Sequence, residues 1–131
     1  MKNFEDIRII DLDEKSSKRI DNNTELFEIN LILSSSAPLE WADYFNKAWK
    51  DHIYQMKREA FVSGDILTIT CGPDELEEHH LPELNKIIDE TNKWYKEYLH
   101  QKKLKQMKEA QKEKEDRELL CRLKESLFGK K

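Results

Sequence analysis

Glycine, proline and cysteine are scarce in this sequence of 131 residues, with three, three and two copies respectively. The glycines are scattered, which excludes the glycine-rich loop that cradles nucleotide phosphates. The two cysteines, Cys71 and Cys121, are too few for a disulfide framework, and we expect both to be reduced. No apolar run approaches the ~20 residues of a membrane span, and the first residues lack the pattern of a secretion signal. We therefore expect a cytoplasmic protein with no membrane partner.

Charge is abundant but unevenly distributed. Residues 1–100 carry 12 basic and 21 acidic side chains, whereas residues 101–131 carry 11 basic and 6 acidic ones. An acidic body with a basic arm suggests an arm that approaches polyanions or acidic proteins, although a solvated helix of lysine and glutamate is the plainer interpretation. We predict a globular domain over residues 1–100 and a basic helical extension over residues 101–131.

Alternating apolar and polar residues predict strands. The clearest lies over residues 27–33, where Phe27, Ile29, Leu31 and Leu33 point to one face. Ile32 adds an apolar side chain to its second face, so we expect this strand to be central. Residues 7–12, 56–62 and 66–71 are the other predicted strands. Residues 13–23 are expected to form a polar loop, and Ser63-Gly64-Asp65 a tight hairpin turn.

Two helices complete the pattern. Three serines followed by Pro38 predict a helix that runs to about His52. Its apolar residues recur at helical spacing and are expected to form core, with an aromatic ligand pocket near Trp41 and Trp49 as the alternative. These residues are Trp41, Ala42, Phe45, Ala48, Trp49 and Ile53. An acidic connection over residues 74–81, with room for a short helical turn, precedes the second helix, which starts at Pro82.

The second helix is predicted to be very long, because no glycine or proline interrupts it from Pro82 to Phe128. Unbroken, it would span ~70 Å, whereas a domain of a hundred residues has a radius of gyration of ~13 Å. The order β-β-α-β-β-α then predicts an α+β fold with a small antiparallel sheet. The first helix and the beginning of the last are expected to cover one face, with the long C-terminal helix extending beyond the domain.

The last part of this helix contains the residues we favour for partner binding. Leu119, Leu120, Leu123, Leu127 and Phe128 form an apolar cluster that follows residues 111–118, which contain no apolar side chain. Apolar clusters of this kind mark interaction sites when they are exposed. A regular coiled coil is not supported, because the heptad that begins at Leu104 and Met107 continues with polar residues. Docking on another chain, docking back on its own domain through a bend, and a disordered end all remain open.

Lysines before this cluster give the alternative site. Phosphate groups could be contacted by Lys102, Lys103, Lys105, Lys108, Lys112 and Lys114. Glutamates interleave with them, arginine is scarce and aromatics are absent, so neither base readout nor base stacking is indicated.

Residues that carry catalytic or metal chemistry are present without a recognisable motif. His79 and His80 lie among glutamates, and histidine with carboxylates can bind zinc. However, adjacent histidines on a helix point about 100° apart, so a solvated acidic segment is favoured. Such a segment could also face a basic partner or imitate nucleic-acid charge. No nucleophile is paired with a base, so we assign no catalytic residue, no metal ligand and no cofactor.

The function we predict is a small cytoplasmic protein-interaction module, an inhibitor or accessory factor, that self-associates through its C-terminal helix. The alternative is a nucleic-acid-binding protein that uses the basic helix. An enzyme or ligand-binding domain, with a pocket between the sheet and the helices near Trp41 and Trp49, is the least favoured class, because no nucleophile is paired with a base.

Overall fold

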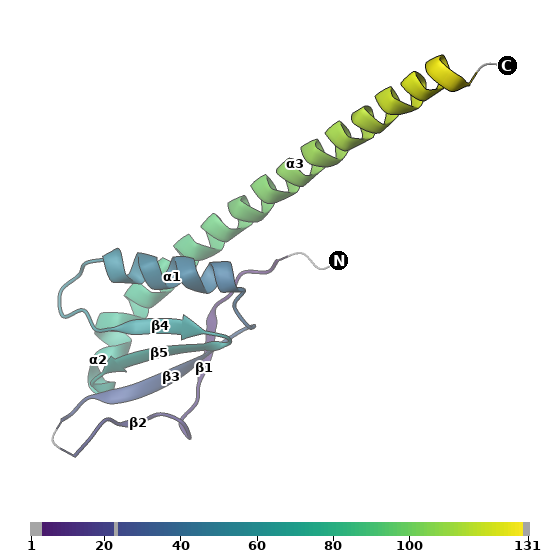
Figure 1. Ribbon diagram of the computed structural model, residues 1–131. Helices are drawn as coiled ribbons and strands as arrows, with labels where there is room; N and C mark the ends of the chain where they lie inside the picture. The colour runs from purple at the N-terminus through teal and green to yellow at the C-terminus, as the bar shows by residue number, and fades with distance from the viewer. Residues whose placement is uncertain (1–3, 23, 130–131) are drawn as a thin grey trace. The chain divides into compact units, whose positions relative to one another are not determined.

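The computed structural model describes residues 4–22 and 24–129 (Figure 1). The elements are β1 Ile9–Leu12, β2 Lys18–Arg19, β3 Phe27–Leu33, α1 Leu39–Asp51, β4 Ala60–Ser63, β5 Ile66–Cys71, α2 Pro73–Glu75, the π-helix η1 Leu76–His80, and α3 Leu81–Phe128. The chain divides into two compact units, residues 1–95 and 96–131. Helix α3 begins in the first unit and ends in the second. The predicted α+β class with a long C-terminal helix is confirmed.

The first unit contains an antiparallel sheet in the order β1-β3-β5-β4, and β2 pairs with β3 beside this path. Strand β3 is central, as its two-sided apolar pattern predicted. Residues of β3 and β5 that share a register pair also share a face, as in Ile29↔Ile69 and Leu31↔Leu67. The sequence missed β2, which lies in the predicted loop of residues 13–23; residue 23 lies outside the described residues.

One face of the sheet forms the core with α1 and the first turns of α3 (Figure 1). The predicted aromatic stripe is confirmed as core, because Trp41, Phe45 and Trp49 are almost completely buried. Helix α3 adds Leu84, Ile87 and Ile88.

A buried polar junction joins three segments of this core. The side-chain amide of Asn92 on α3 bonds both backbone groups of Ile7, at 3.0 and 2.8 Å, and its oxygen also accepts the indole N–H of Trp41 at 2.9 Å. The buried amide is thereby satisfied, and the start of the chain is fixed against the helices.

Helix α1 begins and ends differently from the prediction. Its N-cap is Pro38 rather than a serine, and the hydroxyl of Ser34 instead accepts the backbone N–H of Arg8 at 3.1 Å. At the other end, the Lys57 ammonium donates to three carbonyls of the last turn. A cation at this position satisfies terminal carbonyls and stabilises the helix end, which lies at Asp51. Ile53, predicted as core, is therefore outside the helix and 88% exposed.

Strand β4 is shorter than the predicted strand over residues 56–62. Met56 adopts a positive φ of 64°, which no strand residue can have, and pairing begins only at Ala60. The predicted hairpin turn is confirmed. Gly64 has a φ of +62° and takes the first of two loop positions, where the tight hairpin turns need a positive φ.

The acidic connection before α3 is helical throughout rather than a loop with one turn. Residues 73–75 form α2, and η1 follows with the wider i→i+5 bond from the Leu81 N–H to the Leu76 carbonyl. Pro82 lies in the first turn of α3, as predicted. Proline has no N–H and its ring crowds the carbonyl four residues earlier, which accounts for a widened turn just before it.

Candidate functional site

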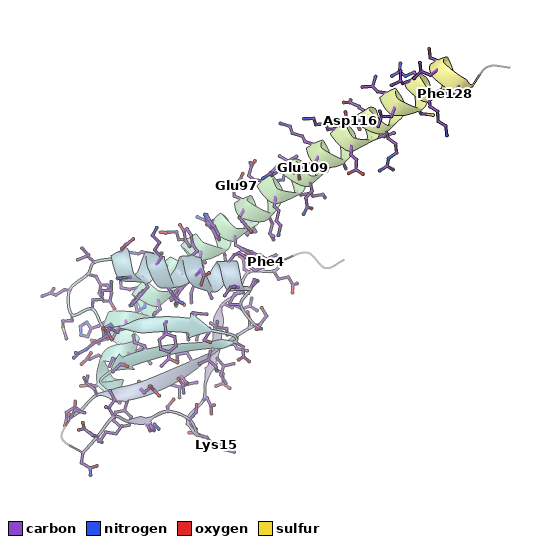
Figure 2. The ribbon with its side chains drawn as sticks, in the orientation of Figure 1. Phe4, Lys15, Glu97, Glu109, Asp116 and Phe128 are labelled. Atoms are coloured by element: carbon purple, nitrogen blue, oxygen red, sulfur yellow. The ribbon has the colours of Figure 1, made fainter. Side chains whose placement is uncertain are left out.

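The C-terminal apolar cluster, Leu119, Leu120, Leu123, Leu127 and Phe128, lies in the second unit near the end of α3. All five side chains are exposed, from 52% for Leu123 to 77% for Phe128. Figure 2 shows the side chains that project from this stretch, with Asp116 and Phe128 labelled near its ends. Large apolar side chains in water are the feature that most clearly distinguishes this segment from an ordinary solvated helix.

The leucines of the cluster form a stripe along one side of the helix. Leu119, Leu123 and Leu127 recur every four residues, and Leu120 is three residues before Leu123. Side chains at these spacings lie one above another on a helix. Phe128 follows Leu127 directly and therefore points to the neighbouring side. The arrangement suits a partner helix or groove that covers a narrow strip.

The lysines of the alternative site precede the cluster on the same helix, and all of them are exposed. Lys105, Lys108 and Lys112 recur at i, i+3 and i+7, so they share one face. Lys102 and Lys103 lie one turn earlier, and Lys102 lies 5.9 Å from the ring centre of Tyr98. Glutamates on the adjoining faces offset this charge. Glu113 and Arg117, four residues apart, form an ion pair at 2.6 Å.

The histidine pair of the sequence separates into two environments. His79 is exposed, whereas His80 is completely buried. The two ring nitrogens of His80 are both engaged, Nδ1 with the Tyr54 hydroxyl at 2.7 Å and Nε2 with the Glu75 carboxylate at 3.0 Å. Among residues 4–22 and 24–129, no three His, Cys, Asp or Glu side chains are grouped to hold a metal ion. His80 therefore packs in the interior, whereas His79 faces solvent.

Glu75 is the centre of this partly buried network, which the sequence did not predict. The Arg58 guanidinium donates to both carboxylate oxygens of Glu75 at 3.0 Å. These bonds and the bond from His80 lower the pKa of Glu75 to about 2. Glu75 therefore stays ionised at neutral pH and links the segment after α1 to the helical connection.

The groups that resemble nucleophiles in this region are not activated. Burial raises the pKa of the Cys71 thiol to about 11, so the thiol is protonated at neutral pH. Burial likewise raises the pKa of Tyr54 to about 12. Cys71, a buried thiol without a thiolate fraction, is a packing residue.

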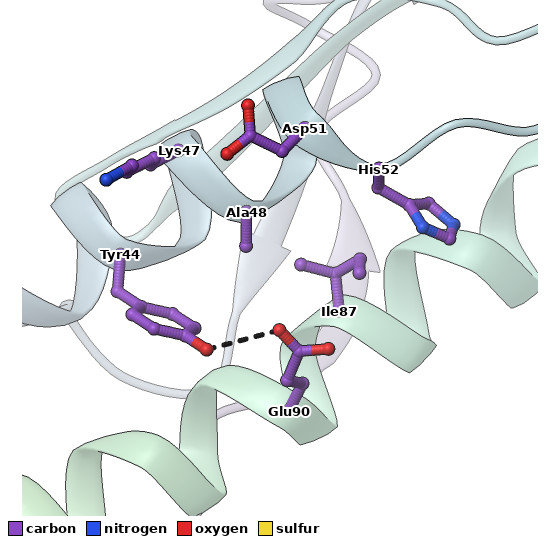
Figure 3. Close-up of a pocket in the computed structure, with 7 residues that line it drawn as sticks. All are labelled: Tyr44, Lys47, Ala48, Asp51, His52, Ile87 and Glu90. Atoms are coloured by element: carbon purple, nitrogen blue, oxygen red, sulfur yellow. Dashed lines mark hydrogen bonds between the residues drawn. The ribbon is translucent and has the colours of Figure 1, made fainter.

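A groove between α1 and the first turns of α3 is lined by Tyr44, Ile87 and Glu90, among other residues (Figure 3). Neither Trp41 nor Trp49 lines this groove, whereas Trp49 lines a second pocket beside β4 and β5. The Tyr44 hydroxyl donates to Glu90 across the groove at 3.2 Å, and burial raises the pKa of Tyr44. At one end, His52 lies 2.6 Å from Glu83. Tyr44 and Glu90 are thus engaged with each other, as are His52 and Glu83.

No protein-family model matches this chain, and searches of curated proteins and of solved structures find no match either. None of the helices in the described part of the chain is long and apolar enough to span a bilayer. Inferences about function therefore come from the molecule itself.

Proposed function

We propose that this protein is a small protein-interaction module that self-associates through the C-terminal apolar cluster. The single observation that carries the proposal is the exposure of five large apolar side chains within ten residues of α3. In this proposal the protein acts as an inhibitor or accessory factor in the cytoplasm. The two cysteines are free, which is consistent with a reducing compartment.

The energetic argument rests on apolar area. Burying a large apolar side chain that was exposed contributes about 1.5–3 kcal/mol. Association costs about 4–15 kcal/mol in lost translational and rotational freedom and in ordering. When two copies meet, both clusters are buried, so their summed gain is large enough to offset a cost in this range. A single cluster that packs against a polar surface would recover only part of it.

The direct test replaces Leu120, Leu123 and Leu127 with serine in the full chain. Serine removes the apolar stripe without adding charge. We expect the mass in solution to fall to that of one chain while the thermal unfolding of the first unit barely changes. Leu104→Ser with Met107→Ser is the matched control, because these exposed apolar residues lie outside the cluster. The control should keep its associated mass.

Two other outcomes would reject the proposal. If the serine variant keeps its mass but unfolds at a lower temperature, the cluster docks within its own chain. If neither quantity changes, the cluster has no role in assembly. The lysines from Lys102 to Lys112 would then become the better candidates.

Nucleic-acid binding through those lysines is the second candidate. The observation that favours it is the exposed common face of Lys105, Lys108 and Lys112. Counterion release would make the affinity for a DNA duplex fall steeply with salt concentration, whereas association through leucines would not weaken in this way. Titration of labelled duplex at low and high salt, with Lys105, Lys108 and Lys112 changed to glutamine as the comparison, separates the two functions.

A further inference from the structure

We propose that the two copies pair with their α3 helices antiparallel, each C-terminal apolar cluster lying against the other. This inference rests on the proposed self-association. It adds the relative direction of the two α3 helices and the surface through which they meet. A pair related by a twofold axis uses the same patch on both copies, so the patch must be complementary to itself. The charges and the leucines of this segment meet that condition in only one direction.

Charge changes sign across the cluster. Residues 113–118 carry four acidic and two basic side chains, whereas Arg122 and Lys124 follow within the cluster and only Glu125 opposes them. Antiparallel helices place the acidic stretch of one copy opposite the segment that begins at Glu125 of the other, so the two acidic stretches do not face each other. Parallel helices place each stretch against the identical stretch of the other copy. Like charges then come into contact, which disfavours the pair.

The lysine face strengthens this choice. Lys105, Lys108 and Lys112 lie at spacings of three and four residues. Leu119, seven residues after Lys112, and Leu123, four residues after Leu119, continue the same face of the helix. In a parallel pair joined by the leucines, these lysines would meet their own counterparts at an interaxial distance of about 8–10 Å. In an antiparallel pair, they lie beyond the end of the partner helix and remain solvated.

The leucines fix the register. Antiparallel pairing centred between Leu120 and Leu123 puts Leu120 of each copy opposite Leu123 of the other, with Leu119 and Leu127 on either side. In this register Cys121 lies near the centre of the pair. Its side chain is exposed and points away from the leucine stripe by helical spacing. The geometry therefore supplies a native attachment point for a probe that does not disturb the contact.

Dipolar distance measurements with nitroxide labels test the direction in the full chain. Cys71 is completely buried, so the label reacts at Cys121. With helices about 8–10 Å apart, labels at Cys121 on outward faces should be roughly 20–30 Å apart in either direction. This first sample reports association alone. Adding Leu123→Ser to it should abolish the signal, and a signal that persists would place the contact elsewhere and overturn the proposal.

A second sample moves the label with Cys121→Ser and Lys105→Cys. In the antiparallel register, the two labels are separated by about 33 residues of helix, or ~50 Å at the rise of an α-helix. In a parallel pair they lie at the same height, at roughly 20 Å or less. A long distance at residue 105 with a short one at Cys121 supports the proposal. Short distances at both sites overturn the direction but keep self-association, whereas no coupling at either site overturns both.

Discussion

Phe45 stacks between the rings of Trp41 and Trp49, with centroid distances of 5.8 and 6.2 Å and nearly parallel planes. It is fully buried. Removing such a side chain leaves a cavity that the rigid neighbours cannot fill. We expect Phe45→Ala to lower the free energy of unfolding by about 3–5 kcal/mol in chemical denaturation. Phe61→Ala is the control, since Phe61 is about half exposed and should cost far less. Equal losses would show that burial does not govern stability here.

Glu75 makes stability depend on pH in a definite direction. Its folded pKa of about 2, set first by Arg58 and then by His80, lies below the usual value for glutamate, about 4.3. The carboxylate therefore stabilises the fold fully above about pH 5, and this contribution is lost as pH falls toward 2. Hydrogen bonds to charged groups contribute about 1.5–3 kcal/mol each.

The matched variant is Glu75→Gln, which keeps the shape of the side chain and cannot ionise. We expect it to unfold more easily than the parent chain at pH 7, and the difference to shrink as pH is lowered from 5 toward 2. Urea denaturation across this range measures the difference. A gap that stays constant with pH would mean that ionisation of Glu75 does not stabilise the fold.

Among the elements, the sequence predicted best those that a regular pattern specifies. Strict alternation located β3 and its central place, and helical spacing located the buried face of α1. Elements set by contacts distant in the chain were missed. The end of α1 depends on the Lys57 side chain, which returns to cap the helix, so Ile53 was wrongly included. Nothing in the spacing of His79 and His80 indicates the widened turn that precedes Pro82 or the burial of His80.

Edge protection is another element-level feature that the sequence did not predict. The side chain of Asn46 bonds both backbone groups of Val62 on β4, at 2.7 and 3.2 Å, and the Trp49 indole donates to the Arg58 carbonyl at 3.0 Å. Helix α1 thus covers the backbone groups of Val62 on an edge strand and of Arg58 just before it, which reduces pairing with another sheet. This favours α3, rather than the β4 edge, as the place of self-association.

The last part of α3 is expected to be dispensable for folding. The buried side chains of the described residues all lie at or before Tyr95. A chain that ends at residue 101 keeps every one of them. We expect it to melt cooperatively and within a few degrees of the full chain, as followed by circular dichroism. A gradual, non-cooperative melt would show that residues 102–131 belong to the core.

At the scale of the whole molecule, the sequence predicts which residues make up the candidate site but not the surface that they contact. The five apolar residues and the lysines were identified from spacing, and the structure adds that they are exposed and which of them share a face. A partner surface cannot be inferred from one sequence, because the complementary residues belong to another molecule. The order of acidic, apolar and basic residues along α3 indicates how the partner binds only if the partner is a second copy of this chain.

The central claim, self-association through the end of α3, is tested most directly by sedimentation equilibrium over a range of concentrations. The full chain is compared with a chain that lacks residues 111–131. We predict that the mass of the full chain rises with concentration from 15.7 kDa toward twice that value, and that added salt does not abolish the rise. The shortened chain should stay at the mass of a single copy. A full chain that remains a single copy at every concentration, or a shortened chain that associates equally, would contradict the account.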